Sequence, residues 1–220
     1  MERKTSLKDA KKIMGPNFIG PAELKSIESE MGIFLPSDIL KNPPNIQFDE
    51  DFLKTIKSDY ILILGIPYYK DKTPLTIVKM RKHFGWDPDN SEPCFYNQDW
   101  YVNEKFAQKG ILELDWYLIR KEVYEDSRGF DSTEIIKKNH SKQMLPFAVL
   151  LAYVFFSYYL LNNGEILWKH DFLWCYDTDH IGDQIYVGKY VDSQGMNKNG
   201  FSIHRHLKIS KLYSYVDSLT

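Results

Sequence analysis

The stretch DTDHIGD in the C-terminal part of the chain combines carboxylates, a histidine and a glycine at spacings that could bind a cation. An EF-hand loop needs oxygen ligands at positions 1, 3, 5 and 12 and a glycine at position 6. Asp177 and Asp179 satisfy positions 1 and 3, and Gly182 satisfies position 6. Ile181 at position 5 and Gly188 at position 12 supply no ligand. The pattern therefore favours an Asp-rich turn whose side chains bind local backbone N–H groups.

Histidines nearby allow a second kind of metal chemistry, because four of the six lie in the last fifty-one residues. On a strand, His204 and His206 would point the same way and could share a Zn²⁺ ion. With His180 or Asp179 as a third ligand, metal-bound water could act as the nucleophile of a hydrolase. The order of His180, Asn199 and His204 also resembles a nuclease signature. A metal-dependent hydrolase or nuclease using His180, His204 and His206 is thus an alternative interpretation.

Other catalytic signatures are missing from the sequence. It has no GxSxG nucleophile pattern and no GxxxxGK[ST] or GxGxxG phosphate-binding loop. The two cysteines, Cys94 and Cys175, are far apart and form no CxxC pair, which predicts reduced thiols. No cofactor is expected from these patterns.

The acidic turn is flanked by short segments whose apolar residues alternate with polar or aromatic ones. In QIYVGKY, Ile185 and Val187 fall on one face of a strand, and Tyr186 and Tyr190 fall on the other. Residues 201–206 alternate in the same way. This period predicts a C-terminal sheet with an apolar back and an outward face of Tyr, Ser and His.

The first two thirds of the chain carry helix start and stop signals such as Gly20-Pro21 and Gly32. Buried strands are predicted over 59–67 and 114–123 from their runs of Ile and Leu, and 126–140 is predicted to be a polar connection. The predicted helices cover residues 6–14, 20–32, 48–58 and 73–84.

Residues 144–161 form the most apolar segment of the chain and are almost long enough for a membrane span. Pro146 lies in the first turn, and Ser157 and three tyrosines interrupt the apolar run. We therefore expect a long buried core helix, and no membrane span.

Composition narrows the class of protein. Hydrophobic residues make up 43% of the 220 residues and charged residues 26%, which predicts a folded domain with a substantial core. A formal net charge of -2 gives no electrostatic reason to expect nucleic-acid binding. The first twelve residues lack the apolar stretch of a signal peptide, so a cytoplasmic location is expected, with export or phage packaging as the alternatives. Fifteen tyrosines suit a surface that binds ligands.

The segment from LPFAVLLAYVFFSYYLLNNGE to FSIHRHLKIS resembles the end of a group of uncharacterised bacterial and archaeal proteins. The pieces KIMGPNFIGPAEL, DWYVNEKFA and WYLIRKEV resemble their N-terminal halves. In that group, the C-terminal segment is similar to the ligand-binding end of C-type-lectin-like folds related to the formylglycine-generating enzyme. Some members resemble the variable proteins of diversity-generating retroelements. The catalytic cysteine pair of that enzyme has no counterpart here, so the resemblance implies binding and not oxidation.

The resemblance implies a scaffold that carries a displayed ligand-binding surface. The scaffold positions are Trp174, Ile185, Val187, Gly188, Phe201 and Ile203. The implied ligand-binding residues are Tyr176, Asp177, Asp179, His180, Asp183, Tyr186, Tyr190, Asn197, Asn199, Ser202, His204 and His206.

These observations together predict an α+β fold with N-terminal helices, short central strands, one long buried helix and a C-terminal antiparallel sheet with a lectin-like irregular surface. The predicted division is a helical segment at 1–45 and an α+β body at 46–220, within which 165–220 is lectin-like; the two could form one compact domain. The predicted function is non-enzymatic recognition of a protein or a glycan. A phage-derived structural or accessory protein is a further alternative, and the sequence does not choose an oligomeric state.

Overall fold

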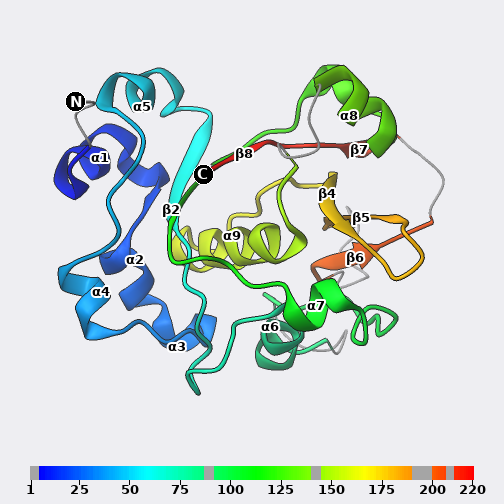
Figure 1. Cartoon of the computed structure of the whole chain (residues 1–220), viewed down its shortest axis with the longest axis horizontal. Coiled ribbons are helices and arrows are strands. Elements are labelled where there is room, and N and C mark those ends of the chain that lie inside the picture. Colours follow the sequence, from blue (N-terminus) through cyan, green and yellow to red (C-terminus); the bar gives the residue numbers. More distant parts are fainter. Residues whose placement is uncertain (1–4, 87–91, 140–144, 190–199, 207–210) are drawn as a thin grey trace.

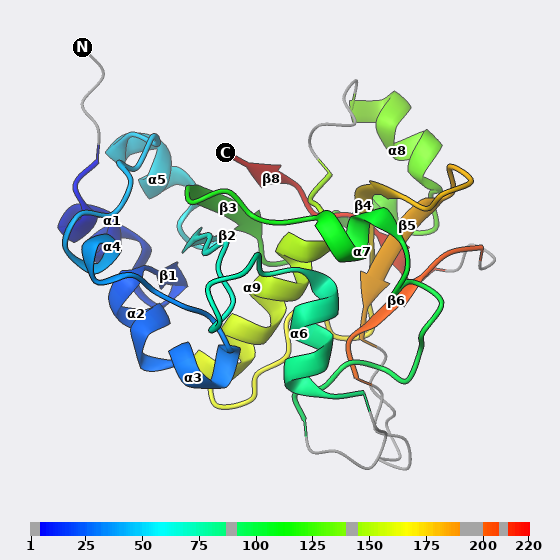
Figure 2. The same ribbon diagram turned by 60° about the horizontal axis from the view of Figure 1, so that its bottom comes forward.

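A computed structural model describes residues 5–86, 92–139, 145–189, 200–206 and 211–220. Within these ranges, the chain forms helices and two four-stranded sheets, which confirms the predicted α+β class. The N-terminal helices lie on one side of the long central helix and the second sheet lies on the other (Figures 1 and 2).

Short helices dominate the N-terminal part, and each follows from local signals. The first begins where the Ser6 hydroxyl accepts the backbone N–H of Asp9 and ends at Gly15, whose φ of 56° suits glycine. The predicted helix at 20–32 is divided at Ile27. The helices of this part are α1 (Leu7–Met14), α2 (Pro21–Ser26), α3 (Glu28–Met31), α4 (Ser37–Lys41) and α5 (Glu50–Ile56).

The first sheet has the order β1-β2-β3-β8. Its central pair is antiparallel, with Leu62 opposite Leu118, and every residue of β2 is buried, as its run of Ile and Leu predicts. The pairing of β1 with β2 is parallel. The strands are β1 (Phe18–Ile19), β2 (Tyr60–Leu64), β3 (Trp116–Arg120) and β8 (Ser218–Leu219).

The second sheet has the order β6-β5-β4-β7 and holds the predicted C-terminal strands. Three strands are antiparallel, as predicted, whereas β7 pairs with β4 in parallel. The purely antiparallel sheet expected from the sequence is therefore wrong at this edge. The strands are β4 (Phe172–Thr178), β5 (Gln184–Gly188), β6 (Ser202–His204) and β7 (Tyr213–Ser214).

The apolar segment forms α9 (Ala148–Leu161) at the centre of the molecule (Figure 1). Its residues from Ala148 to Tyr158 are all buried, and the ring of Phe156 stacks on Phe84 at 4.0 Å. Among the residues that the structure describes, no helix is long and apolar enough to cross a membrane, as the sequence predicts. The segment is apolar all round because protein covers it on every side.

Besides α9, three further helices of the described residues lie between β2 and β4 in the sequence. They are α6 (Ile77–Phe84), α7 (Lys105–Lys109) and α8 (Ser132–Asn139). The polar connection predicted at 126–140 is wrong, because this stretch contains α8 and a short 3-10 turn, Glu125–Ser127. Ile135 of α8 is buried, which ties the helix to the second sheet.

Two hydrophobic clusters fill the interior. The larger one runs from Ala10 to Val216 and includes buried residues on both sides of the predicted boundary at 45/46. The smaller one lies on the opposite face of β4 and β5 and includes Trp174 and Tyr186. The second sheet is thus buried on both faces.

Candidate functional site

The turn between β4 and β5 is organised by Asp179, whose side chain is fully buried. One carboxylate oxygen accepts the backbone N–H groups of Ile181 and Asp183 at 3.0 and 2.9 Å. The other accepts Nη1 of Arg205 at 2.6 Å. Burial alone would raise the pKa of Asp179, but the hydrogen bonds from Arg205 and the turn lower it below its ordinary value. This is the Asp-rich turn that the sequence predicts.

His180 extends this network to α7. Its Nδ1 lies 2.7 Å from Oε1 of Glu104, and its backbone N–H donates to Oε2 of the same carboxylate at 3.0 Å. Glu104 is buried and is the N-cap residue of α7, where negative charge is favourable. The side chain of His180 is 66% exposed, so its ring remains accessible to a ligand.

Asp183 and His206 complete the cluster at the surface. Nδ1 of His206 lies 3.0 Å from Asp183, and its Nε2 lies 3.9 Å from Asp179. The potential ligand atoms of Asp179, Asp183 and His206 all lie within 4.8 Å of one another. These three residues could hold a divalent cation, although Arg205 already provides a positive charge at Asp179.

The predicted histidine triad is not brought together. His180 contacts Glu104, whereas Nδ1 of His204 lies 3.1 Å from the side-chain amide of Gln98. The ring of His204 also stacks on Tyr186, with the ring centroids 5.6 Å apart, and burial lowers its pKa to about 4. Within the described ranges, only Asp179, Asp183 and His206 form a group close enough to share an ion. Of the three histidines in the alternative metal set, this group contains His206.

Two residues expected on the outer face are buried. Tyr186 is 1% exposed and packs between Trp174 and Tyr213, and the Ser202 hydroxyl donates to the carbonyl of Gly188. The predicted alternation is correct, but the second cluster covers the face that was expected to meet solvent. Tyr190, Asn197 and Asn199 lie outside the described residues. The scaffold positions Trp174, Ile185, Val187, Phe201 and Ile203 are buried.

Tyr176 is exposed and lies against Phe147. The two ring centroids are 4.9 Å apart, and the exposed fractions are 38% for Tyr176 and 48% for Phe147. Asp177 fixes this arrangement, because its carboxylate accepts the backbone N–H of Ala148 at the start of α9 at 2.6 Å. A second bond joins the backbone N–H of Tyr176 to the carbonyl of Pro146. The pair is thus held by the strand and the helix together.

Two cavities open beside the Phe147–Tyr176 pair, and both rings contribute to the walls of each. One, of about 330 Å³, is also lined by Lys105 and Lys109 of α7. The other, of about 230 Å³, is lined by Tyr117 and by residues near the last strand. This arrangement gives two adjoining sites with an aromatic divider and charged groups on one side.

Four participants in these sites were missed from the sequence: Phe147, Glu104, Arg205 and Lys105. Arg205 lies between two predicted histidines, and a strand period continued past His204 would place it on the inner face with Ile203. Its side chain instead turns to Asp179 because β6 ends at His204. Nothing local in the sequence signals the role of Glu104, which lies 76 residues before its partner.

Comparison of the chain with protein-family models, with curated proteins and with solved structures found no match.

Proposed function

We propose that this protein is a non-enzymatic recognition protein that binds a glycan at the Phe147–Tyr176 pair. The observation that carries the proposal is the exposure of two adjoining aromatic rings between two cavities. Aromatic side chains give rigid contact area at low entropic cost, and Tyr adds a polar tip. The lectin-like resemblance of the C-terminal segment is a second, independent reason.

The shape of the site favours a sugar over a protein. A pyranose ring has an apolar C–H face that can lie on an aromatic ring and a rim of hydroxyls that needs polar partners. Lys105 and Lys109 supply donors beside the rings. A stable protein partner would instead need roughly 800 Å² of contact surface on each side. Two small cavities beside one aromatic pair fit consecutive sugar units better than a broad protein face.

An oligosaccharide array, probed with the purified protein, tests this proposal. We expect binding to be lost in Phe147→Ala and Tyr176→Ala, each by at least about tenfold in affinity. Tyr68→Ala is the matched control, because Tyr68 is equally exposed at 38% but lies outside both cavities. Equal binding by all three variants would contradict the proposed site. Capture of a protein and of no glycan would favour the protein-ligand alternative.

A metal-dependent hydrolase is the second candidate, on the observation that Asp179, Asp183 and His206 place donor atoms within 4.8 Å of one another. Carboxylate and imidazole groups suit Zn²⁺. Arg205 competes for the same carboxylate of Asp179, which makes this candidate weaker. Metal analysis of the purified protein decides: stoichiometric Zn²⁺ that is lost in His206→Ala and Asp183→Ala would support it.

A further inference from the structure

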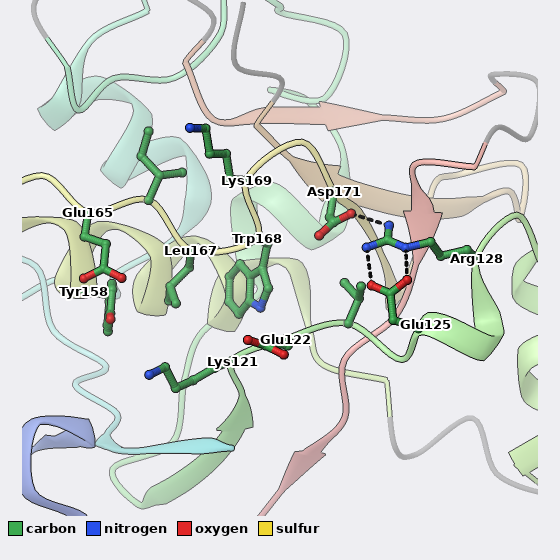
Figure 3. Close-up of a pocket in the computed structure, with 12 residues that line it drawn as sticks. Lys121, Glu122, Glu125, Arg128, Tyr158, Glu165, Leu167, Trp168, Lys169 and Asp171 are labelled. Carbon is green, nitrogen blue, oxygen red and sulfur yellow. Dashed lines mark hydrogen bonds and ion pairs between the residues drawn. The ribbon is translucent and has the colours of Figure 1, made fainter. Parts of the chain in front are cut away.

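A third cavity, of about 480 Å³, has none of the sequence-predicted site residues in its walls. It opens between the segment that follows β3, the end of α9 and the loop at 165–171 (Figure 3). Its volume is within the usual range for small-molecule sites, which begins at about 300 Å³. Unlike the aromatic pair, this cavity is lined mainly by charged side chains.

Part of the charge that lines the cavity is neutralised by ion pairs within the protein. The guanidinium of Arg128 forms two hydrogen bonds with Glu125, at 2.6 and 2.7 Å, and one with Asp171, at 2.5 Å (Figure 3). Two carboxylates around one guanidinium leave one negative charge in excess. These hydrogen bonds raise the pKa of Arg128 further, so it keeps its charge at every accessible pH.

Three other charged residues of the cavity are uncommitted. Lys121, Lys169 and Glu122 form no salt bridge within the part of the chain that the structure describes. Burial, and then the nearby Glu165 carboxylate, raise the pKa of Tyr158. Lys121 and Lys169 lie on opposite sides of the Trp168 ring, with Glu122 below it and Glu165 towards one side (Figure 3).

The loop that carries Lys169 has an unusual backbone. Trp168 and His170, on either side of Lys169, adopt left-handed φ values of 50° and 70°. Such values are unfavourable for side chains with a Cβ, and they persist only where the surroundings enforce them. Here the indole N–H of Trp168 donates to the carbonyl of Arg120, and the backbone N–H of His170 donates to the carbonyl of Lys189. The loop is therefore held in the conformation that keeps Lys169 at the cavity.

We infer that this cavity binds a small zwitterion, such as a free amino acid. Either uncommitted lysine can bind a carboxylate, and Glu122, Glu165 or Asp171 can bind an ammonium group. The excess of carboxylates disfavours a ligand that carries only negative charge. The two uncommitted lysines disfavour a ligand that carries only positive charge. Only a ligand with both charges satisfies both sets of groups.

Thermal unfolding of the full-length protein with each standard L-amino acid at millimolar concentration tests the inference. Because a ligand that binds only the folded state raises Tm, we expect at least one amino acid to raise it by several degrees. Its N-acetyl derivative, which lacks the ammonium, and its amide, which lacks the carboxylate, should both lose the effect. No shift with any amino acid, or equal shifts with the derivatives, would overturn the inference without any variant being needed.

Variants then locate the site by calorimetric titration with the same amino acid. We expect Lys169→Gln and Glu122→Gln each to weaken binding about tenfold, since each removes one charged contact. Lys82→Gln, which changes an exposed lysine of α6, is the matched control. Tyr176→Ala should also leave this binding unchanged, so the glycan proposal and this one can fail separately. Unaltered affinity in both cavity variants would refute the assignment to this cavity.

Discussion

Asp179 is the residue on which the β4–β5 turn depends. Its carboxylate has no exposed surface, and it is balanced by Arg205 and by two backbone N–H groups. Removal of this carboxylate would leave two backbone N–H groups without their acceptor, and Arg205 with Glu104, 3.8 Å away, as its remaining carboxylate. The neighbouring pair of Asp183 and His206 is about half exposed, and solvent weakens it.

Asp179→Ala should therefore lower the free energy of unfolding by about 3 kcal/mol. Asp183→Ala, its control in the same turn, should lower it by less than about 1 kcal/mol. Urea unfolding followed by tryptophan fluorescence measures both values. Similar losses in the two variants would contradict the central role of Asp179.

His204 makes stability depend on pH. Burial lowers the pKa of His204 from 6.5 to about 4, so the unfolded chain takes up a proton at a higher pH than the folded protein does. The unfolded state then binds more protons between these values, and stability falls as the pH drops from 6.5 towards 4. The full contribution, roughly 3 kcal/mol, is present above pH 6.5.

His204→Phe should remove this dependence while the ring still packs on Tyr186 and Phe172. Urea unfolding at pH 7 and pH 5 compares the variant with the unaltered protein. We expect the unaltered protein to lose more stability between the two pH values than the variant does. Parallel losses would show that other groups cause the dependence.

Sequence reasoning at this scale identified residue types better than partners. It placed Asp179 in a turn that binds backbone N–H groups, which the structure confirms. It did not identify Glu104 as the partner of His180, or Phe147 as the partner of Tyr176, because these pairs depend on how α7 and α9 meet the second sheet. A single sequence contains no local signal for such contacts.

Among the elements, β5 shows why the alternation of residue types did not identify which face of the strand is exposed. A period of two shows that two faces differ, but not that one of them meets water. Ile185 faces the larger hydrophobic cluster, and Tyr186 faces the smaller one, which includes Ile135 of α8. Both faces of β5 are covered, so Tyr186 does not meet solvent. The tyrosine of the hairpin that is exposed is Tyr176, which lies on β4.

Two tyrosines of the same hairpin should therefore respond differently to truncation. Tyr186→Ala removes a fully buried ring and should cost about 3–5 kcal/mol of unfolding free energy. Tyr176→Ala removes a half-exposed ring and should cost less than about 1 kcal/mol. Chemical denaturation of both variants checks this. A small effect of Tyr186→Ala would mean that the second cluster contributes little.

The start of α8 is signalled in the sequence by a capping box, which the prediction missed. Asp131 and Glu134 form a capping box: the Asp131 carboxylate accepts the Glu134 N–H at 2.8 Å, and the Glu134 carboxylate accepts the Asp131 N–H at 2.9 Å. This D-x-x-E pattern was a usable helix start. The helix itself is polar in sequence because Ile135 and Ile136 are the only apolar residues of Ser132–Asn139, and their burial depends on distant Tyr213 and Tyr215. The helices with clear caps and the runs of Ile and Leu were predicted correctly, as at α1 and β2.

For the whole molecule, the decisive feature is a single large cluster that extends from Ala10 to Val216. The N-terminal helices contribute Leu24 and Met31, and the sulfur of Met31 accepts a hydrogen bond from Ser157 of α9. Residues on the two sides of the predicted 45/46 boundary therefore stabilise one another.

We expect one cooperative unfolding transition, with tryptophan fluorescence and far-ultraviolet circular dichroism giving the same midpoint. A fragment of residues 46–220 should not fold cooperatively, because it lacks β1 and exposes the part of the core that the N-terminal helices cover. Urea titration of the fragment and of the full chain makes the comparison. A fragment that unfolds with a sharp transition of its own would establish the predicted boundary.

The position of β8 in the first sheet has a consequence for synthesis on the ribosome. Leu118 and Ile119 of β3 pair with Leu219 and Ser218, whereas all strands of the second sheet lie between them in the sequence. A nascent chain must therefore carry β3 with one unpaired edge until residues 218–219 have emerged. Unpaired edges can join to other chains. Chaperones that act during translation would thus have most to protect at β3, well before the C-terminal strand arrives.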